Sequence, residues 1–260
     1  MPTESSTGTF LQGLERGLAV IRAFSAEAPS QTLSEVARGV GITPATARRI
    51  LLTLEELGYV RSDGRRFSLT PRVLALGWAY LSSQDLGELA GPFMEELSAK
   101  TRESCSIATL DLPDIVYVAR VPTSRIMTVA LGVGARLPAY PTSMGRVLLS
   151  GLPDDELTSY LETLQTQPLT DRTVTSPEAL RAAIHRARED GYALVDQELE
   201  LGLRSIAAPI RNSRGHIIAA LNVSAHASRS TPTSLCTEVL PHLQQAAAQI
   251  ATALTHTGHR

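Results

Sequence analysis

The sequence predicts an α+β protein made of two domains that a short helix joins. Three observations support this fold class. Apolar residues recur at helical spacing through the first quarter of the chain. A helical segment over residues 71–83 has no polar side. From residue 84 onward, short alternating strands mix with helices and hairpin turns, which is typical of an antiparallel sheet with helices packed on it.

The domain boundaries follow from these patterns. Residues 1–9 are polar and rich in Ser and Thr, and we expect a disordered tail there. We expect a first domain over 10–70, a connecting helix over 71–83 and a second domain over 84–260. A chain of 260 residues is long enough for each domain to bury a core of its own.

Composition excludes several classes of protein. The apolar share is 43%, the charged share is 19% and the net charge is −2, so general basicity does not indicate a nucleic-acid partner. Cys105 and Cys236 are too far apart for a metal motif or a disulfide framework, which favours a reduced cytoplasmic protein. The chain shows neither a secretory signal nor an apolar run approaching about 18 residues, so we expect no membrane partner.

The first domain begins with a helix over about residues 11–26. Thr32 then has the character of a helix N-cap, and Glu35 three residues later completes a capping box. Gly41 ends this second helix, because the turn needs a positive φ that glycine adopts cheaply. A tight helix–turn–helix arrangement is the expected result.

The third helix begins at Thr43 as the cap, with Pro44 at the first helical position. Its predicted inward stripe is Ala47, Ile50, Leu51, Leu54 and Leu57, and Gly58 ends the helix. The outward face is then Ala45, Thr46, Arg48, Arg49 and Thr53. Asp63-Gly64 between two short β-prone runs is a strong hairpin signal and predicts a wing.

A winged helix-turn-helix with this surface is suited to double-stranded DNA. Residues 48–66 hold five arginines against three acids, so positive charge is concentrated there. An outward helix face can enter the major groove, and a wing can reach phosphates or the minor groove. Any one arginine is better explained as a solvated side chain, but five on adjacent elements favour DNA binding. The candidate DNA-binding residues are Thr43, Ala45, Thr46, Arg48, Arg49, Arg65 and Arg66.

The connecting helix predicts an oligomer. A helix that is apolar all round must be buried all round, and a lone linker between two domains cannot achieve this. We therefore expect a second copy of the chain to cover it, with Leu74, Trp78 and Leu81 in the contact.

The second domain is predicted as a series of helices and strands. Helices are expected over 88–100, 142–150, 154–163, 177–189 and 233–254. Strands are expected over 104–110, 115–121, 126–131, 193–198, 205–211 and 216–224, with turns at 112–114 and 212–215.

Two features of this domain are candidates for a ligand site. Thr142 resembles an N-cap, so the N–H groups of Ser143, Met144 and Gly145 would be able to bind a carboxylate, although an ordinary capped helix explains the cap as well. Asn222 and Ser224 share one face of an otherwise apolar strand. Structural and ligand-binding roles explain these two residues about equally well.

Catalytic signals are weak. The chain has no nucleophile elbow, phosphate-binding glycine loop or paired-histidine metal motif, so we expect no enzyme, cofactor or metal. Cys105 is better explained as a buried filler than as a nucleophile. Two alternatives remain: an enzyme whose winged helix docks to a protein, and a regulator whose second domain only oligomerises.

Several segments resemble the IclR family of bacterial transcription regulators, from about Gly13 to Ile250. Besides the winged helix, these are residues 137–149 (LPAYPTSMGRVLL) and 202–210 (GLRSIAAPI). Residues 63–74 (DGRRFSLTPRVL), 80–83 (YLSS) and 195–199 (VDQEL) are similar to the branch that regulates protocatechuate, 4-hydroxybenzoate and β-ketoadipate catabolism. A regulator of another catabolic pathway, with a different effector, is the alternative.

The resemblance implies a GAF-like effector-binding domain, a small organic acid as effector, and dimers or dimers of dimers on operator DNA. It implies that Val195 stands where the family usually places an acid or a serine, with Asp196 one position later and Arg204 as a rival polar contact. The implied effector pocket comprises Leu137, Ser143, Met144, Asp196, Leu203, Ser205, Asn222 and Ser224, with Val129 and Leu131 as an apolar wall.

Overall fold

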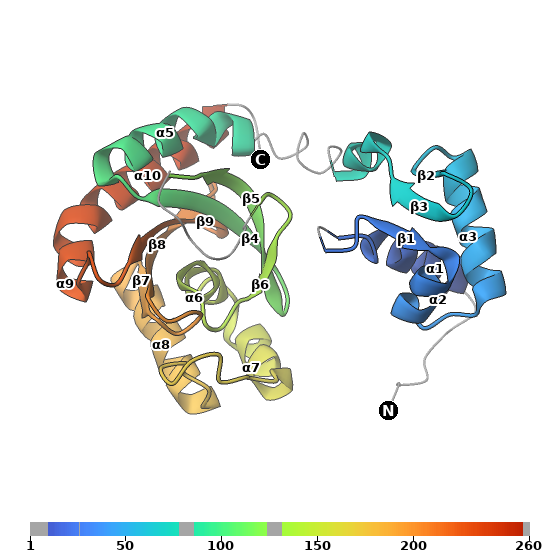
Figure 1. The fold of residues 1–260 in the computed structure, drawn as a ribbon. Coiled ribbons are helices and arrows are strands. Elements are labelled where there is room, and N and C mark those ends of the chain that lie inside the picture. Colours follow the sequence, from blue (N-terminus) through green and yellow to red (C-terminus); the bar gives the residue numbers. More distant parts are fainter. Residues whose placement is uncertain (1–9, 26, 78–85, 124–131, 257–260) are drawn as a thin grey trace. The chain divides into compact units, whose positions relative to one another are not determined.

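The computed structural model describes residues 10–25, 27–77, 86–123 and 132–256. The chain divides into two compact units, Met1–Ser83 and Gln84–Arg260 (Figure 1). Each unit has a hydrophobic core of its own.

The N-terminal unit packs three helices beside a small sheet. The helices are α1 (Gln12–Arg22), α2 (Leu33–Val40) and α3 (Pro44–Glu56). The antiparallel strands β1 (Ser30–Thr32), β2 (Val60–Ser62) and β3 (Arg66–Leu69) lie in the order β1-β3-β2. The core holds Val20, Phe24, Val36, Leu51, Leu54 and Val60. The predicted winged helix-turn-helix is therefore confirmed.

Local signals in the sequence set the ends of these elements. Thr32 Oγ1 accepts the N–H of Glu35 while the Glu35 carboxylate accepts the N–H of Thr32, which is the predicted capping box. Gly41 ends α2 at φ +71°. In the wing, Asp63 Oδ1 accepts the N–H groups of Arg65 and Arg66 at 2.9 and 2.7 Å. These bonds close the predicted turn.

Three details differ from the prediction. The first helix is shorter than the expected 11–26 and ends at Arg22. Strand β1 was not predicted, because three residues carry too little alternation to stand out in a sequence. Leu57 was assigned to the inward stripe of α3 but is 51% exposed, because it follows the last helical turn rather than continuing it.

The connecting segment is described only at its start. Thr70 caps the short 3₁₀ helix η1 (Pro71–Val73), and residues 74–77 continue as helix. Leu74 is 75% exposed within its own chain. Trp78 and Leu81, the other two predicted contact residues, lie outside the described residues.

The C-terminal unit is built on a six-stranded antiparallel sheet in the order β6-β5-β4-β9-β8-β7. Figure 1 shows α6 in the hollow of the curved sheet, with α5 and α10 on the outer side. The strands are β4 (Ser104–Asp111), β5 (Asp114–Val121), β6 (Arg136–Pro138), β7 (Ala193–Asp196), β8 (Leu203–Arg211) and β9 (Ile217–His226). The helices are α5 (Leu86–Thr101), α6 (Ser143–Leu149), α7 (Asp154–Thr163), α8 (Pro177–Asp190), α9 (Pro232–Ser234) and α10 (Leu240–His256), with the π-helical turn η2 (Leu235–Val239) before α10.

This unit confirms the α+β prediction and corrects several element bounds. Edge strand β6 was not predicted, and the strand expected over 126–131 lies outside the described residues. Strand β7 ends at Asp196 rather than at 198, because Gln197 has φ +63° and leaves the extended conformation. The single C-terminal helix expected over 233–254 is interrupted by the π-helical turn η2.

No helix among the described residues is both long and apolar enough to cross a membrane. Within the same residues, no three side chains of His, Cys, Asp or Glu are arranged to hold a metal ion.

Candidate functional site

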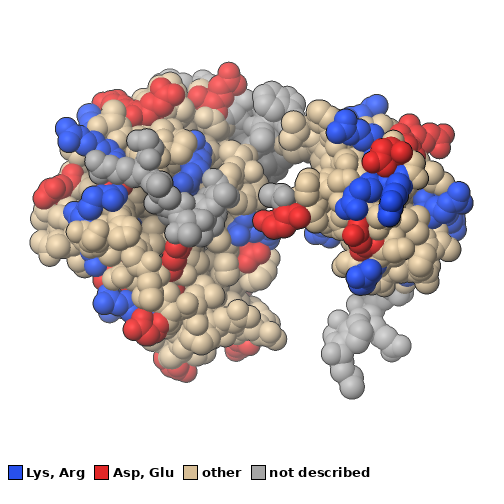
Figure 2. Space-filling view, viewed as in Figure 1, with Lys and Arg blue, Asp and Glu red and all other residues tan. Residues whose placement is uncertain are grey.

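The outward face of α3 is the candidate DNA-binding surface. Ala45, Arg48 and Arg49 are exposed on it, as predicted, while Ala47 and Leu51 are fully buried on the opposite side. No ion pair ties Arg48 or Arg49 to an acidic residue in the described part of the chain. Leu52, which was not among the candidates, is 44% exposed on the same face. Figure 2 shows several arginine side chains on the visible face of this unit.

The two threonines at the start of α3 are hydrogen-bonded to each other. Thr43 Oγ1 accepts the N–H of Thr46 at 3.2 Å, and the two hydroxyl oxygens lie 2.9 Å apart. The capping role predicted for Thr43 is therefore confirmed. A contact of either threonine with DNA remains a prediction.

The two wing arginines differ. Arg65 is exposed. The Arg66 guanidinium instead donates to the backbone oxygen and hydroxyl of Ser30 at 2.5 and 3.3 Å, and it lies 3.4 Å from the Glu35 carboxylate. Arg66 thus fastens the wing to β1 and to the start of α2. Hydrogen bonding to Thr32, followed by the nearby Arg66 charge, holds the pKa of Glu35 below its ordinary value.

A buried cluster of hydroxyl and amide groups is the candidate effector site. Ser143 opens α6, Ser205 lies on β8, and Asn222 and Ser224 lie on β9. The Ser143 and Ser205 hydroxyl oxygens are 2.6 Å apart. Asn222 Nδ2 donates to the hydroxyls of Ser205 and Ser224 at 3.1 and 3.0 Å. The fold thus brings the start of α6 beside the consecutive strands β8 and β9, and Ser143 and Ser205 lie 62 positions apart in the sequence.

One polar atom of this cluster has no partner. The Oδ1 atom of Asn222 is fully buried and accepts no hydrogen bond from the described residues. Leaving a buried acceptor unpaired costs about 1–3 kcal/mol, so a ligand hydroxyl or amide that donates to it would recover much of this cost. The neighbouring Tyr117 phenol is also buried, which raises its pKa to about 12. A tyrosine is neutral at physiological pH even with its ordinary pKa, so the Tyr117 hydroxyl can donate a hydrogen bond.

The cavity beside the cluster is small. Its volume is about 30 Å³, compared with roughly 10–15 Å³ for one water and 300–1,000 Å³ for typical ligand pockets. An aromatic acid fits only if a wall moves. Besides the polar cluster, the described walls are Tyr117, Pro141, Thr142, Met144, Val195, Leu199 and Leu203.

Asp196 and Arg204 face away from this cavity, which corrects their assignment as effector contacts. In the pairing of β7 with β8, Val195 lies opposite Ser205, and Asp196 lies opposite Arg204. Because neighbours along a strand point to opposite faces, Val195 joins the cavity and Asp196 does not. The two candidate charges neutralise each other instead, with Arg204 Nε 2.8 Å from Asp196 Oδ1.

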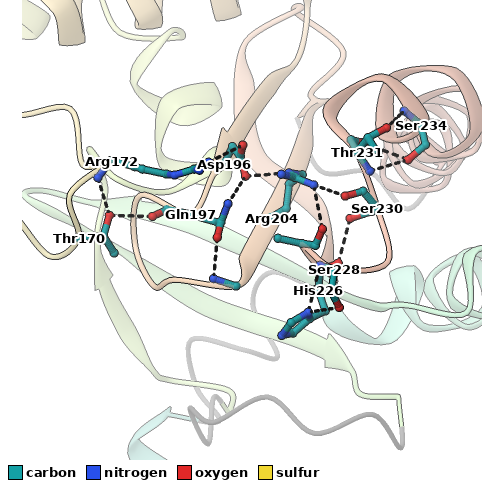
Figure 3. Close-up of polar contacts among 12 residues, drawn as sticks. Thr170, Arg172, Asp196, Gln197, Arg204, His226, Ser228, Ser230, Thr231 and Ser234 are labelled. Carbon is teal, nitrogen blue, oxygen red and sulfur yellow. Dashed lines mark hydrogen bonds and ion pairs between the residues drawn. The ribbon is translucent and has the colours of Figure 1, made fainter.

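Figure 3 shows the hydrogen-bond network that Asp196 and Arg204 form on the side of the sheet that faces away from the cavity. Asp196 also binds Arg172 at 3.2 Å, and Arg204 donates to the backbone oxygens of Ala227 and Ser230. The hydrogen bond from Arg204 is the main reason that the pKa of Asp196 lies below its ordinary value. This network joins the end of the β7–β8 hairpin to the loop before α9.

Gly145 is also misassigned as an effector contact. A Cβ atom at this position would lie 2.0 Å from the backbone oxygen of Ala139, so the glycine permits close packing of α6 on that segment. Its N–H is taken by Thr142 Oγ1 at 3.0 Å. Of the three N–H groups expected to meet a ligand, this one is therefore unavailable.

A buried ion pair next to the cavity was not predicted as part of the site. Arg146 Nη2 on α6 lies 2.6 Å from Glu198 Oε2 in the β7–β8 loop, and their side chains are 6% and 9% exposed. Glu198 Oε2 also accepts the N–H of Val174 at 3.0 Å. The pair is 52 positions apart in the sequence, so no local pattern connects its members.

Comparison with known proteins identifies the family to which the chain belongs. The IclR helix-turn-helix domain matches residues 13–64, and the C-terminal domain of the bacterial transcriptional regulator IclR matches residues 78–252. The chain belongs to the IclR family. It is a transcriptional regulator with an N-terminal DNA-binding domain and a C-terminal effector domain.

Two relatives in this family share most of their length with the chain. It is 47% identical over 235 residues to the Pca regulon regulatory protein of Pseudomonas putida, covering 90% of this chain and 81% of the relative. It is 37% identical over 252 residues to the p-hydroxybenzoate hydroxylase transcriptional activator of Acinetobacter baylyi, covering 95% and 93%.

A solved structure is similar over nearly the whole fold. It is an IclR homologue from Microbacterium hydrocarbonoxydans complexed with 4-hydroxybenzoate, with a TM-score of 0.82 and 26% identity. The similarity covers 93% of this chain and 98% of that one.

The remaining residues carried over from the IclR resemblance divide into three groups. Ser143, Met144, Leu203, Ser205, Asn222 and Ser224 line the cavity. Leu137 packs against the main core from edge strand β6 and is not among the cavity walls. Val129 and Leu131 lie outside the described residues.

Proposed function

We propose that the chain binds a palindromic operator through the outward face of α3, supported by Arg65 on the wing, and that a small organic acid of aromatic-acid catabolism controls this binding. The proposal that an acid binds in the C-terminal domain rests on the buried Ser143–Ser205–Asn222–Ser224 cluster, in which Asn222 Oδ1 has no hydrogen-bond partner among the described residues. Hydroxyl and amide groups hold a carboxylate or a phenol by hydrogen bonds. The relatives named for the Pca regulon and for p-hydroxybenzoate hydroxylase support the pathway.

A larger groove elsewhere in the domain is a poorer site for such an acid. It lies beside α7 and has a volume of about 830 Å³. Its described lining residues include Asp114, Asp155 and Glu156 and no lysine or arginine. A carboxylate ligand would be repelled there, because like charges disfavour each other. The hydroxyl and amide cluster is therefore the better candidate despite its smaller volume.

We expect the alanine variant of Ser143 to lose effector affinity. Removing a hydroxyl that contacts the ligand costs about 0.5–1.5 kcal/mol, or roughly twofold to tenfold in Kd. The measurement is ligand-induced thermal stabilisation across a series of aromatic and dicarboxylic acids, since a ligand that binds the native state raises Tm.

The matched control is Ser150→Ala. Ser150 is also buried, at the other end of α6, where its hydroxyl donates to Val147 O and does not line the cavity. This variant should respond to the acid as the parent protein does. Equal responses of Ser143→Ala and the parent would remove Ser143 from the effector site.

On the DNA side, Arg49→Ala should weaken operator binding by about 1–3 kcal/mol if Arg49 contacts a base, and by less if it contacts only phosphate. Arg22→Ala is the control, because it removes the same charge from an exposed position at the end of α1. Titration of a labelled operator at two salt concentrations measures both variants. An affinity of Arg49→Ala equal to that of the control would contradict the placement of α3.

The chain is proposed to act as a dimer or as a dimer of dimers. The exposed Leu74 supports this, and so do Leu11, Leu14 and Leu18 on and beside α1, which are 71%, 63% and 47% exposed. Paired recognition helices reach successive major grooves when they are about 34 Å apart. An effector that favours one spacing would change operator affinity. Sedimentation of the full-length chain tests this proposal, and a monomer at working concentration would overturn it.

An enzymatic role for the C-terminal domain finds little support. Cys105, the one cysteine within the sheet, is fully buried, and desolvation raises the pKa of its thiol to about 12. A thiol in this state is a poor nucleophile at neutral pH. Turnover of a candidate acid by the purified protein is the observation that would favour an enzyme.

A further inference from the structure

Leu52 occupies an unusual position on α3. It is 44% exposed on the face that carries Arg48 and Arg49, which lie four and three residues before it. Ala45 lies two turns earlier on the same stripe. A leucine by type suggests core packing, so the sequence alone did not mark it as a surface residue.

The core of the N-terminal unit does not use this side chain. On the buried side of α3, Ala47 and Leu51 are fully buried and Leu54 is 8% exposed. The other exposed leucine nearby, Leu57, lies about 140° around the helix axis from Leu52 if the helical spacing continues. Leu52 is therefore a lone large apolar group at the C-terminal end of a cationic helix face.

The flanking charges indicate which partner covers it. A protein or lipid partner would have to desolvate Arg48 and Arg49 to reach Leu52, whereas a polyanion neutralises them. Glu56, one turn further on, is exposed and would be repelled by phosphate, so the contact surface ends near Leu52. In the major groove, the one apolar group on a base edge is the 5-methyl of thymine.

We propose that Leu52 contacts a thymine 5-methyl group in each operator half-site and thereby sets a preference for an A·T pair at that position. This inference rests on the proposed placement of α3 in the major groove. In this arrangement Leu52 recognises a base through an apolar contact, whereas Arg48 and Arg49 act through hydrogen bonds and charge.

The test uses the full-length protein and a duplex selected by it from a random library. Each thymine of one half-site is replaced in turn by deoxyuridine, which removes only the methyl group. One such replacement should weaken binding of the parent protein by about threefold to tenfold, the scale of one buried methyl. Leu52→Ala should bind the unmodified duplex more weakly than the parent by a similar factor. Replacing the critical thymine by deoxyuridine should then cause no further loss of affinity.

Leu57→Ala is the matched control, since it truncates a similarly exposed leucine that lies off this face. It should keep both the parent affinity and the parent penalty for deoxyuridine. The proposal is overturned if the parent is indifferent to every replacement, or if Leu52→Ala keeps the full penalty. In either of these two cases the protein still binds a specific duplex, so the proposed placement of α3 survives. If the protein selects no duplex at all, the proposed placement of α3 is overturned as well.

Discussion

Replacing Glu198 by alanine is expected to lower the free energy of unfolding of the effector domain by about 3–5 kcal/mol. The loss of stability comes mainly from Arg146, which would remain buried without its counter-charge. Arg146 is 5% exposed and would keep its charge in the interior without the carboxylate 2.6 Å away. Val174 would also lose the acceptor of its N–H. Chemical denaturation followed by circular dichroism measures the change.

A compensating double variant separates charge from packing. Arg146→Met with Glu198→Leu removes both charges, and replacing a buried ion pair by apolar residues of similar volume is often nearly neutral. The double variant should therefore be more stable than Glu198→Ala. A Glu198→Ala variant within about 1 kcal/mol of the parent would show that water or another group satisfies Arg146, contrary to the geometry.

The second large effect is expected at Gly145. A methyl group here would lie 2.0 Å from Ala139 O and 2.5 Å from Ala139 C, and backbone cannot move aside as a flexible side chain can. Overpacking of this kind typically costs about 1–3 kcal/mol and sometimes more, and we expect Gly145→Ala at or above the upper end. The measurement is the thermal unfolding midpoint of the effector domain.

Gly87→Ala provides the control, because it adds the same methyl group to a helix of the same domain. A Cβ at Gly87 on α5 meets Val118 O at 3.6 Å, which is an ordinary contact distance. Alanine should leave the midpoint unchanged or raise it slightly, since glycine in a helix is unfavourable by roughly 0.5–1 kcal/mol. Equal midpoints for the Gly145 and Gly87 variants would contradict the packing role of Gly145.

The N-terminal domain could be predicted largely because its signals are local. The Thr32–Glu35 capping box, the turn at Gly41 and the Asp63-Gly64 hairpin each act over a few residues, and the structure contains all three. The exposed arginines of α3 followed from helical spacing alone. Strand β1 was missed because its three residues pair with β3 from a distance.

The effector site depends on long-range geometry, and prediction from sequence was correspondingly weaker there. The Ser143–Ser205 contact joins positions 62 apart, and the Arg146–Glu198 pair joins positions 52 apart. The faces of Val195 and Asp196 are set by the register of β7 on β8, where a shift of one residue reverses the side that each faces. Leu52 was placed on neither face of the predicted helix, although its spacing from Ala45 and Arg48 puts it on the outward face.

The central claim is that acid binding in the C-terminal domain changes the affinity of α3 for operator DNA. The most direct measurement is the Kd of the full-length protein for its operator, with and without the acid that stabilises it most, against random competitor duplex at moderate salt. We predict a preference for the operator and a change of about fivefold to 150-fold when the acid is added, the usual range of coupling between two sites. An operator Kd that is unchanged by a bound acid, or no greater affinity than for random duplex, would contradict it.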